Sequence, residues 1–305
     1  MNQRISTSDA FGPWVECCKM QGSGNDFVVL DNRALQLAQD EMPDWARAVC
    51  RKAFGVGADG LILLDTTPPG VEADYIWHFY NADGSRAEMC GNGSRCAARL
   101  AHELGLAGKT HVLGTDAGPI KAEVLPDQDL VKVQLTPHHD LRLGLNLTLT
   151  LESSLPKASE QLESTPSWDA HFVNTGVPHL VVFSPDVAGL DVQDLGRRFR
   201  EHPRFAPSGT NVNFVQVQDR ENLLLRTYER GVEGETYACG TGAAASALIT
   251  HALNRTGPEV NIRTSGGELL GITIHQDAVF LTGKAVLVFT ANLNLRSLGL
   301  NRTEP

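Results

Sequence analysis

An internal duplication constrains the fold of this chain more than any other feature of the sequence. Each half carries a cysteine followed by a glycine-rich turn, Cys90–Gly93 and Cys239–Gly242, and then a segment of small residues. An earlier glycine turn precedes each cysteine by a similar distance, 68 residues from Gly22 to Cys90 and 63 from Gly176 to Cys239. The shared order and spacing predict two domains of one fold, with their cysteines in equivalent places.

Local patterns predict an α+β fold with many short strands. Apolar runs separated by turn residues are typical of strands, and the Ala-rich run Ala243–Leu253 has high helix propensity. We expect two pseudo-symmetric domains, 1–140 with Cys90 and 141–280 with Cys239, each with strands wrapped around a central helix. A C-terminal strand at about 281–292 is expected to return to the first domain. The expected strands include 75–80, 131–135, 211–218, 269–274 and 285–289, and the expected helices are 44–52, 192–201 and the segments after both cysteines.

A run of alternating leucines lies near the domain junction. Leucine occupies every second position from Leu141 to Leu151, with mostly polar residues between. This period of two predicts a long strand with one apolar face that needs a cover. The cover is either an ordinary sheet neighbour or a subunit contact. The polar segment Glu152–Ser167 is expected to be a loop.

Composition and charge exclude several classes of protein. The chain has 305 residues, of which 42% are hydrophobic and 20% charged, as in a globular protein with a substantial core. A net charge of −10 argues against a nucleic-acid or anionic-membrane binder, and no apolar run is long enough for a membrane helix. The six cysteines are too scattered for a disulfide scaffold and no export signal is evident, so we expect reduced thiols and a cytoplasmic location.

Cys90 and Cys239 are expected at positions that favour thiol reactivity and carboxylate binding. Each is expected at the N-terminus of a helix, where unpaired N–H groups and a partial positive charge lower a thiol pKa and bind a carboxylate. Two such helices could hold one carboxylate with a sulfur on either face of the adjacent carbon, which suits inversion of a stereocentre. The other cysteines are expected to be inert core residues: Cys17, Cys18, Cys50 and Cys96.

Several motifs together resemble the diaminopimelate epimerase family, in the same order from about Met20 to Phe289. They are residues 22–26, 55–60, 81–85, 90–93, 209–214 and 229–242. The resemblance implies an isomerase that interconverts LL- and meso-diaminopimelate in lysine and peptidoglycan biosynthesis, with two cysteines and no pyridoxal phosphate, metal or other cofactor. It also implies a homodimer.

The resemblance assigns roles to particular residues. Cys90 and Cys239 are the implied acid–base pair. Backbone N–H groups would hold the reacting carboxylate, and polar side chains would line the substrate pocket; these residues are Gly91, Asn92, Gly240 and Thr241, and Asn25, Asn81, Asn211, Glu229 and Arg230. His179 is either a supporting residue beside a thiol or a structural histidine. Two positions depart from the pattern: Val177 stands where many members carry Asn, and Gly60 where some carry Gln.

The sequence is also compatible with three other functions. Proline or hydroxyproline racemases share the two-cysteine design, but they usually carry His at the position of Asn92 and lack the Glu229–Arg230 pair. A metal or redox protein using Cys90 and Cys96 would be of another class, although the five-residue spacing is not a usual ligand spacing. A non-catalytic binding protein on the same fold is a third alternative.

Overall fold

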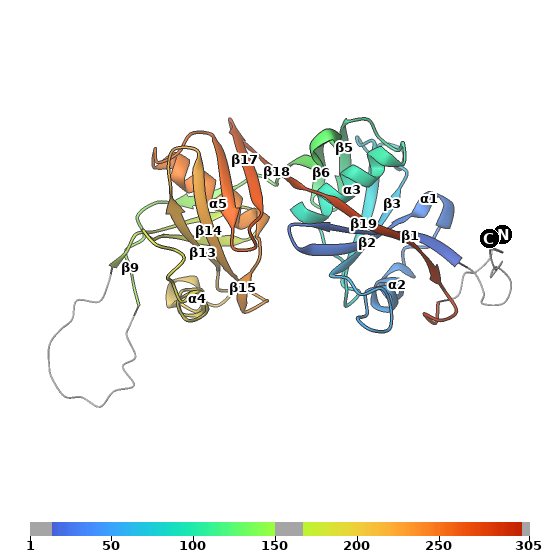
Figure 1. Cartoon of the computed structure of the whole chain (residues 1–305), viewed down its shortest axis with the longest axis horizontal. Helices are drawn as coiled ribbons and strands as arrows, with labels where there is room; N and C mark the ends of the chain where they lie inside the picture. Colours follow the sequence, from blue (N-terminus) through green and yellow to red (C-terminus); the bar gives the residue numbers. More distant parts are fainter. Residues whose placement is uncertain (1–13, 150–166, 301–305) are drawn as a thin grey trace, which may run out of the picture. The chain divides into compact units, whose positions relative to one another are not determined.

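A computed structural model describes residues 14–149 and 167–300 of the chain (Figure 1). It divides the chain into two compact units. Unit 1 contains the residues up to Gln134 together with those from Gly283 onward, and unit 2 is Leu135–Thr282. The chain therefore leaves unit 1, forms unit 2 and then returns to unit 1.

Unit 1 is a mixed sheet with one long helix. β1 is antiparallel to both β2 and β19, β2 is parallel to β3, and β4 is parallel to β5. The pairs β3–β4, β5–β6 and β6–β7 are antiparallel. The elements are β1 (Trp14–Gly22), β2 (Asn25–Asp31), α1 (Asn32–Leu35), α2 (Met42–Val49), β3 (Gly60–Asp65), β4 (Tyr75–Asn81), α3 (Gly91–Glu103), β5 (Thr110–Thr115), β6 (Gly118–Leu125), η1 (Pro126–Gln128), β7 (Leu130–Gln134) and β19 (Val286–Asn294).

Unit 2 repeats this topology. β12 is parallel to β13 and β14 to β16, while β11–β12, β13–β14, β16–β17 and β17–β18 are antiparallel. The elements are β8 (His139–Arg142), β9 (Leu147–Thr148), β10 (Ser167–Trp168), β11 (Ala170–Asn174), β12 (Pro178–Phe183), α4 (Val192–Arg200), η2 (Pro203–Phe205), β13 (Asn211–Val217), β14 (Asn222–Glu229), β15 (Gly234–Thr236), α5 (Gly240–Ala252), β16 (Glu259–Thr264), β17 (Leu269–His275) and β18 (Ala278–Lys284).

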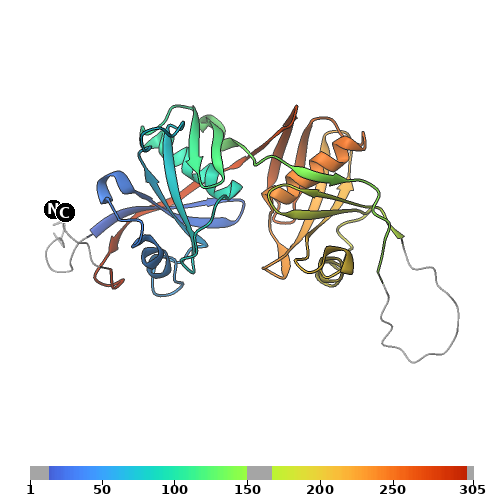
Figure 2. The same ribbon diagram turned by 180° about the vertical axis from the view of Figure 1, so that it is seen from behind.

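Each sheet curves around the long helix of its own unit (Figures 1 and 2). α3 contacts β1, β2, β3, β6 and β7, and α5 contacts β11, β12, β13, β14 and β17. Small side chains allow this close enclosure: Ala243–Thr250 of α5 is buried throughout. The predicted fold class, a duplicated α+β architecture with strands around a helix, is confirmed. None of the helices in the described parts of the chain is long and apolar enough to span a membrane.

The outer neighbour of the first strand differs between the units. In unit 2, β11 pairs with β8, which precedes it in the chain. In unit 1, β1 instead pairs along its length with β19, with Cys17 opposite Ala291. Leu293 near the end of this strand and Leu295 directly after it pack into the unit 1 core. Unit 1 is thus completed by the last strand of the chain.

The alternating leucines do not form the single long strand that their period predicts. Leu141 and Leu143 are 41% and 43% exposed, whereas Leu145, Leu147 and Leu149 are buried in the unit 2 core. Gly144, with φ +68°, breaks the run between β8 and β9. Because Gly144 adopts a left-handed conformation, the strand β8, which ends at Arg142, is not continued through it, and the later leucines turn into the core. Residues 150 and 151, and most of the expected 152–167 loop, lie outside the described residues.

Candidate active site

Cys90 occupies the N-cap of α3. Its backbone is extended (φ −149°, ψ 119°), and its Sγ accepts a hydrogen bond from the N–H of Gly93 at 3.5 Å. The side chain is partly buried. The first N–H groups of a helix have no partner within the helix, so those of Gly91 and Asn92 are directed toward any ligand bound beside Cys90.

Cys239 occupies the equivalent place at the start of α5. Its Sγ accepts from the N–H of Gly242 at 3.4 Å and lies 3.5 Å from Thr241 Oγ1. Thr175 Oγ1 donates to the carbonyl oxygen of Thr241 at 3.0 Å, which ties the end of β11 to the first turn of the helix. Both cysteines therefore cap helices of 13 residues, each through a hydrogen bond from the glycine three positions later.

The charge state of Cys239 differs from the expectation for a helix N-terminus. Burial, reinforced by the negative charge of Glu229, raises the pKa of Cys239 to about 12. The hydrogen bonds from Thr241 and Gly242 favour the thiolate but are the smaller effects. With only 7% of its surface exposed, the sulfur cannot be solvated as an anion, so it is a neutral thiol at pH 7. The prediction of a lowered pKa is wrong for this residue.

A buried arginine organises the Cys90 end of unit 1. Arg95 is fully buried, and its guanidinium donates to Ser23 Oγ, to Asn92 Oδ1 at 3.0 Å and to the carbonyl oxygen of Lys284 at 3.3 Å. Asn92 Nδ2 in turn donates to Asn25 Oδ1 at 2.6 Å. The side chain of Asn92 thus links Arg95 to Asn25, in addition to the backbone role expected for it.

Sequence reasoning missed Arg95. The available signal was its position, because Arg95 stands directly between Ser94 and the buried run Cys96–Ala98 in the first turns of the central helix. Asn25 also donates through Nδ2 to Asp59 Oδ2 at 3.0 Å, so both ends of its amide are fixed.

Asn81 and Gly60 lie together at the ends of paired strands. Asn81 is exposed, and its Nδ2 donates to Ser85 Oγ at 3.0 Å within its own turn. Gly60 is its register partner. A Cβ at Gly60 would lie 2.8 Å from the carbonyl oxygen of Tyr80 and 2.7 Å from the Phe79 ring, so no larger residue fits there without a shift. The close packing of β3 on β4 therefore explains this glycine.

The predicted binding residues of unit 2 gather around the ends of β13 and β14. Asn211 Oδ1 accepts from the backbone N–H of Arg230 at 2.8 Å. Arg230 donates through Nη1 to the carbonyl oxygen of Ser208 at 3.2 Å. Glu229 accepts from Thr236 Oγ1 at 2.6 Å, and its charge acts on Cys239 as described. The structure thus brings an anion, a cation and an amide to the Cys239 end of unit 2.

His179 is fully buried and part of a polar network. Its Nδ1 lies 3.0 Å from Asn213 Nδ2. Asn213 Nδ2 also donates to the carbonyl oxygen of Leu180 at 3.0 Å, and Asn213 Oδ1 accepts from Thr227 Oγ1 at 3.0 Å. Burial, with a smaller contribution from the charge of Arg230, lowers the pKa of His179 to about 3, so the imidazole is neutral. Sequence reasoning assigned no role to Asn213, although this residue lies in the motif 209–214.

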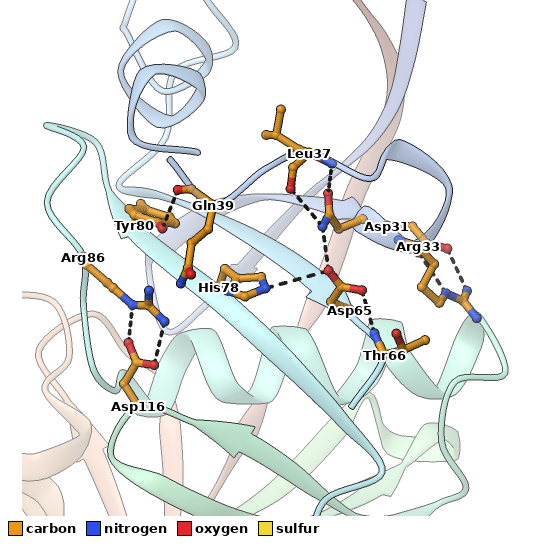
Figure 3. Close-up of polar contacts among 11 residues, drawn as sticks. Asp31, Arg33, Leu37, Gln39, Asp65, Thr66, His78, Tyr80, Arg86 and Asp116 are labelled. Carbon is orange, nitrogen blue, oxygen red and sulfur yellow. Dashed lines mark hydrogen bonds and ion pairs between the residues drawn. The ribbon is translucent and has the colours of Figure 1, made fainter. Parts of the chain in front are cut away.

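A second polar cluster in unit 1 is structural (Figure 3). His78 Nε2 lies 3.8 Å from Asp65, and burial lowers the pKa of His78, which disfavours the charged form of the imidazole. Asp65 accepts from Asn32 Nδ2 at 2.6 Å and from the backbone N–H of Thr66 at 2.8 Å. These bonds tie α1 to β3, and the cluster includes none of the residues predicted for the site.

The remaining cysteines lie apart from the two helix N-termini. Cys17, Cys50 and Cys96 are buried and Cys18 is half-buried. Burial raises the pKa of Cys17 to about 11 and that of Cys50 to about 12. Among the described residues, no group of three potential ligands could hold a metal ion, so the structure gives no support to a metal site at Cys90 and Cys96.

Comparisons with known proteins identify one family that matches most of the chain. The family model described as diaminopimelate epimerase matches residues 17–139 and 171–288. A diaminopimelate epimerase of Hydrogenobaculum sp. (strain Y04AAS1) is 45% identical over 285 residues, covering 90% of this chain and 97% of that protein. One of Aquifex aeolicus (strain VF5) is 46% identical over 290 residues, covering 92% and 98%.

Two solved structures show similarity of fold alone. A phenazine biosynthesis protein of the PhzF family from Bacillus anthracis is 15% identical, with a TM-score of 0.66 and coverage of 92% of this chain and 99% of that one. A hydroxyproline epimerase from Agrobacterium vitis is 18% identical, with a TM-score of 0.60 and coverage of 92% of each chain.

Proposed function

This chain belongs to the diaminopimelate epimerase family, and we propose that Cys90 and Cys239 perform its reaction as a pair of opposed acid–base groups. The enzyme is an isomerase that interconverts LL- and meso-diaminopimelate, a step toward lysine. The observation that supports this mechanism is an arrangement found in both units. In each, a cysteine caps the central helix and accepts from the third N–H of that helix.

In the proposed reaction one sulfur, as thiolate, removes the α-proton and the other, as thiol, delivers a proton to the opposite face. The electron pair of the broken C–H bond moves into the adjacent carboxylate. Backbone N–H groups of Gly91, Asn92, Gly240 and Thr241 would bind that carboxylate and stabilise the added charge. This chemistry requires no pyridoxal phosphate and no metal, and it requires both half-sites to act on one substrate carbon.

The polar side chains would distinguish diaminopimelate from smaller amino acids. The substrate carries two ammonium and two carboxylate groups, so its site needs charges of both signs. We propose that Arg230 binds the distal carboxylate and Glu229 an ammonium group, with Asn25, Asn81 and Asn211 donating and accepting hydrogen bonds. The side chain of Val177 offers no hydrogen bond at a position where the family resemblance implies an amide in many members, so we expect this side-chain contact with the substrate to be absent.

The test is proton NMR of LL-diaminopimelate with the reduced protein in D2O and no added cofactor. Loss of the α-proton signal with formation of the meso isomer is expected. Cys90→Ala and Cys239→Ala should each abolish the reaction, whereas Cys50→Ala, which removes a buried thiol far from either helix N-terminus in sequence, should retain it. A Cys90→Ala or Cys239→Ala protein that keeps more than half of the wild-type rate would exclude the two-base mechanism. Exchange of proline or hydroxyproline instead would indicate a racemase of that type.

We also propose a homodimer in a reducing, cytoplasmic environment. Large apolar side chains of β1 and β19 are exposed in the single chain, among them Trp14, Val288 and Phe289, which a second copy could cover. None of the six cysteines, all of which lie in the described parts of the chain, is in a disulfide. The proposed chemistry requires this of Cys90 and Cys239. Light scattering at micromolar concentration tests the dimer; a monomeric mass with full activity would exclude it.

A further inference from the structure

Three equivalent buried positions carry polar side chains in unit 2 and apolar side chains in unit 1. The strand registers align β2 and β3 with β12 and β13, and β4 with β14. By this alignment the counterparts of the polar trio His179, Asn213 and Thr227 are Phe27, Ile62 and Phe79. All six are buried, and the Phe27 and Phe79 rings meet edge to face at 5.9 Å. The fold therefore accepts an apolar trio here, and packing alone does not require the polar one.

The hydrogen bonds of Asn213 determine the tautomer of His179. The carbonyl oxygen of Leu180 can only accept, so the Asn213 atom facing it at 3.0 Å is the amide nitrogen, Nδ2. The same Nδ2 lies 3.0 Å from His179 Nδ1 and donates to it. Thr227 Oγ1 fixes the other end of the amide by donating to Oδ1. His179 Nδ1 is therefore an acceptor, and the single proton of the neutral ring is on Nε2.

That proton has no partner among the described residues. His179 Nε2 is a fully buried nitrogen without a hydrogen-bond partner, which is costly unless a ligand supplies an acceptor. Its surroundings favour an anion. The charge of Arg230 acts on this ring, and Asn213 Oδ1 lies against the first turn of α5 at Gly242. A cation and a helix N-terminus both attract a carboxylate.

We propose that Asn213 is a positioning residue that holds His179 as its Nε2–H tautomer, so that Nε2–H donates to a carboxylate oxygen of the bound substrate. The second half of this inference rests on the proposed function; the first half does not. Asn213 acts through His179 and touches no substrate itself. The apolar counterparts Phe27, Ile62 and Phe79 offer no such side-chain donor in unit 1.

Histidine NMR tests the tautomer in the ligand-free protein. Long-range proton–nitrogen spectra of the wild type, with His179 assigned from its loss in His179→Gln, should show a proton on Nε2 and none on Nδ1. Asn213→Asp should reverse this, because the carboxylate accepts from Nδ1–H. The matched control Thr227→Val removes the hydroxyl but keeps Nδ2, so the tautomer should persist. A wild-type ring protonated on Nδ1, or on both nitrogens at pH 7, overturns the proposal without any variant.

Addition of diaminopimelate tests the acceptor. Saturation with diaminopimelate should shift the NMR resonance of the His179 Nε2–H proton as the new hydrogen bond forms. An unchanged resonance at saturation would overturn the inference that this proton binds a substrate carboxylate. Asn213→Asp should lower kcat/KM about tenfold or more relative to Thr227→Val, the range expected when a hydrogen bond to a charged group is lost. If Asn213→Asp does not fold, Asn213→Ile copies the residue of unit 1 and should fold with the same loss. A protein inactive on diaminopimelate would refute the proposed function while leaving the tautomer result intact.

Discussion

At the residue scale, Cys239 is held as a neutral thiol by burial and by the charge of Glu229. At pH 8 a thiol with a pKa of about 12 is ionised to roughly one part in ten thousand, whereas an unfolded cysteine is substantially ionised. We expect iodoacetamide to alkylate Cys239 roughly a hundredfold or more slowly in the folded protein than in urea, as measured by peptide mass spectrometry. Equal rates in the two states would contradict the raised pKa.

Because of His179, we expect the free energy of unfolding of the protein to fall at acidic pH. His179 has a folded pKa of about 3, below the unfolded value near 6.5, so the folded state favours the neutral ring. Above pH 6.5 both states are neutral and the residue contributes no pH dependence. Below it the unfolded chain gains a proton, and stability falls by about 1.4 kcal/mol per pH unit until pH 3. Urea unfolding from pH 7 to pH 4 should show a shallower dependence in His179→Gln; parallel curves would contradict this.

Arg95 is expected to support both stability and binding. Arg95→Met would leave the buried acceptors Ser23 and Asn92 without this donor, at about 1–3 kcal/mol each when no other partner replaces it, and would remove the partly buried bond to the Lys284 carbonyl. Since Asn92 orients Asn25, KM for diaminopimelate should rise as well. Arg95→Lys keeps the charge but not the planar set of donors, and should be intermediate. Denaturant unfolding and KM measure these effects; a Met variant with wild-type values of both would show that Arg95 has neither role.

At the element scale, the N-terminal turns of α3 and α5 differ in what lies beneath their third residue. A Cβ at Gly93 would lie 3.4 Å from Ile62 and from Trp77, an ordinary contact, whereas at Gly242 it would overlap Asn213 Oδ1. Alanine favours a helix over glycine by about 1 kcal/mol, so Gly93→Ala should be neutral or stabilising. Gly242→Ala should lose about 1–3 kcal/mol through overpacking. Thermal unfolding of the pair checks this; equal melting temperatures would contradict it.

The leucine run shows where an element could not be predicted from its pattern. The period of two indicated one strand, and alternate burial is kept from Leu145 to Leu149. The strand β8 nevertheless ends at Arg142, and Gly144 two residues later has a positive φ, after which the later leucines lie in the unit 2 core. The two-residue spacing of the leucines indicates which side chains lie on the same face, but it does not indicate where the backbone changes direction.

At the scale of the whole molecule, the duplication was enough to predict the fold and the cysteines at two helix N-termini. The same reasoning could not find Asn213 or the charge state of Cys239. Both depend on burial and on partners distant in sequence, such as Thr227 beneath Asn213 and Glu229 beside Cys239. An internal repeat in the sequence shows which features the two units share. Residues that differ between the units, such as Asn213, have to be found from the structure.

The return of β19 makes the stability of unit 1 depend on the end of the chain. Leu295 is fully buried in the unit 1 core, so Leu295→Ala should cost about 2–5 kcal/mol. Hydrogen exchange should show faster opening in unit 1 than in unit 2, because the lost contacts belong to unit 1. Leu141→Ala removes an exposed side chain and should change stability by about 0.5 kcal/mol or less. Equal effects of the two substitutions would contradict this assignment.

The same return sets an order of completion during synthesis. β1 leaves the ribosome early, but its partner β19 emerges only after all of unit 2 has been made. At about 5–20 residues per second, the interval is on the order of tens of seconds. Unit 2, encoded second, can close its sheet first, while one edge of β1 waits unpaired and open to association with other nascent chains.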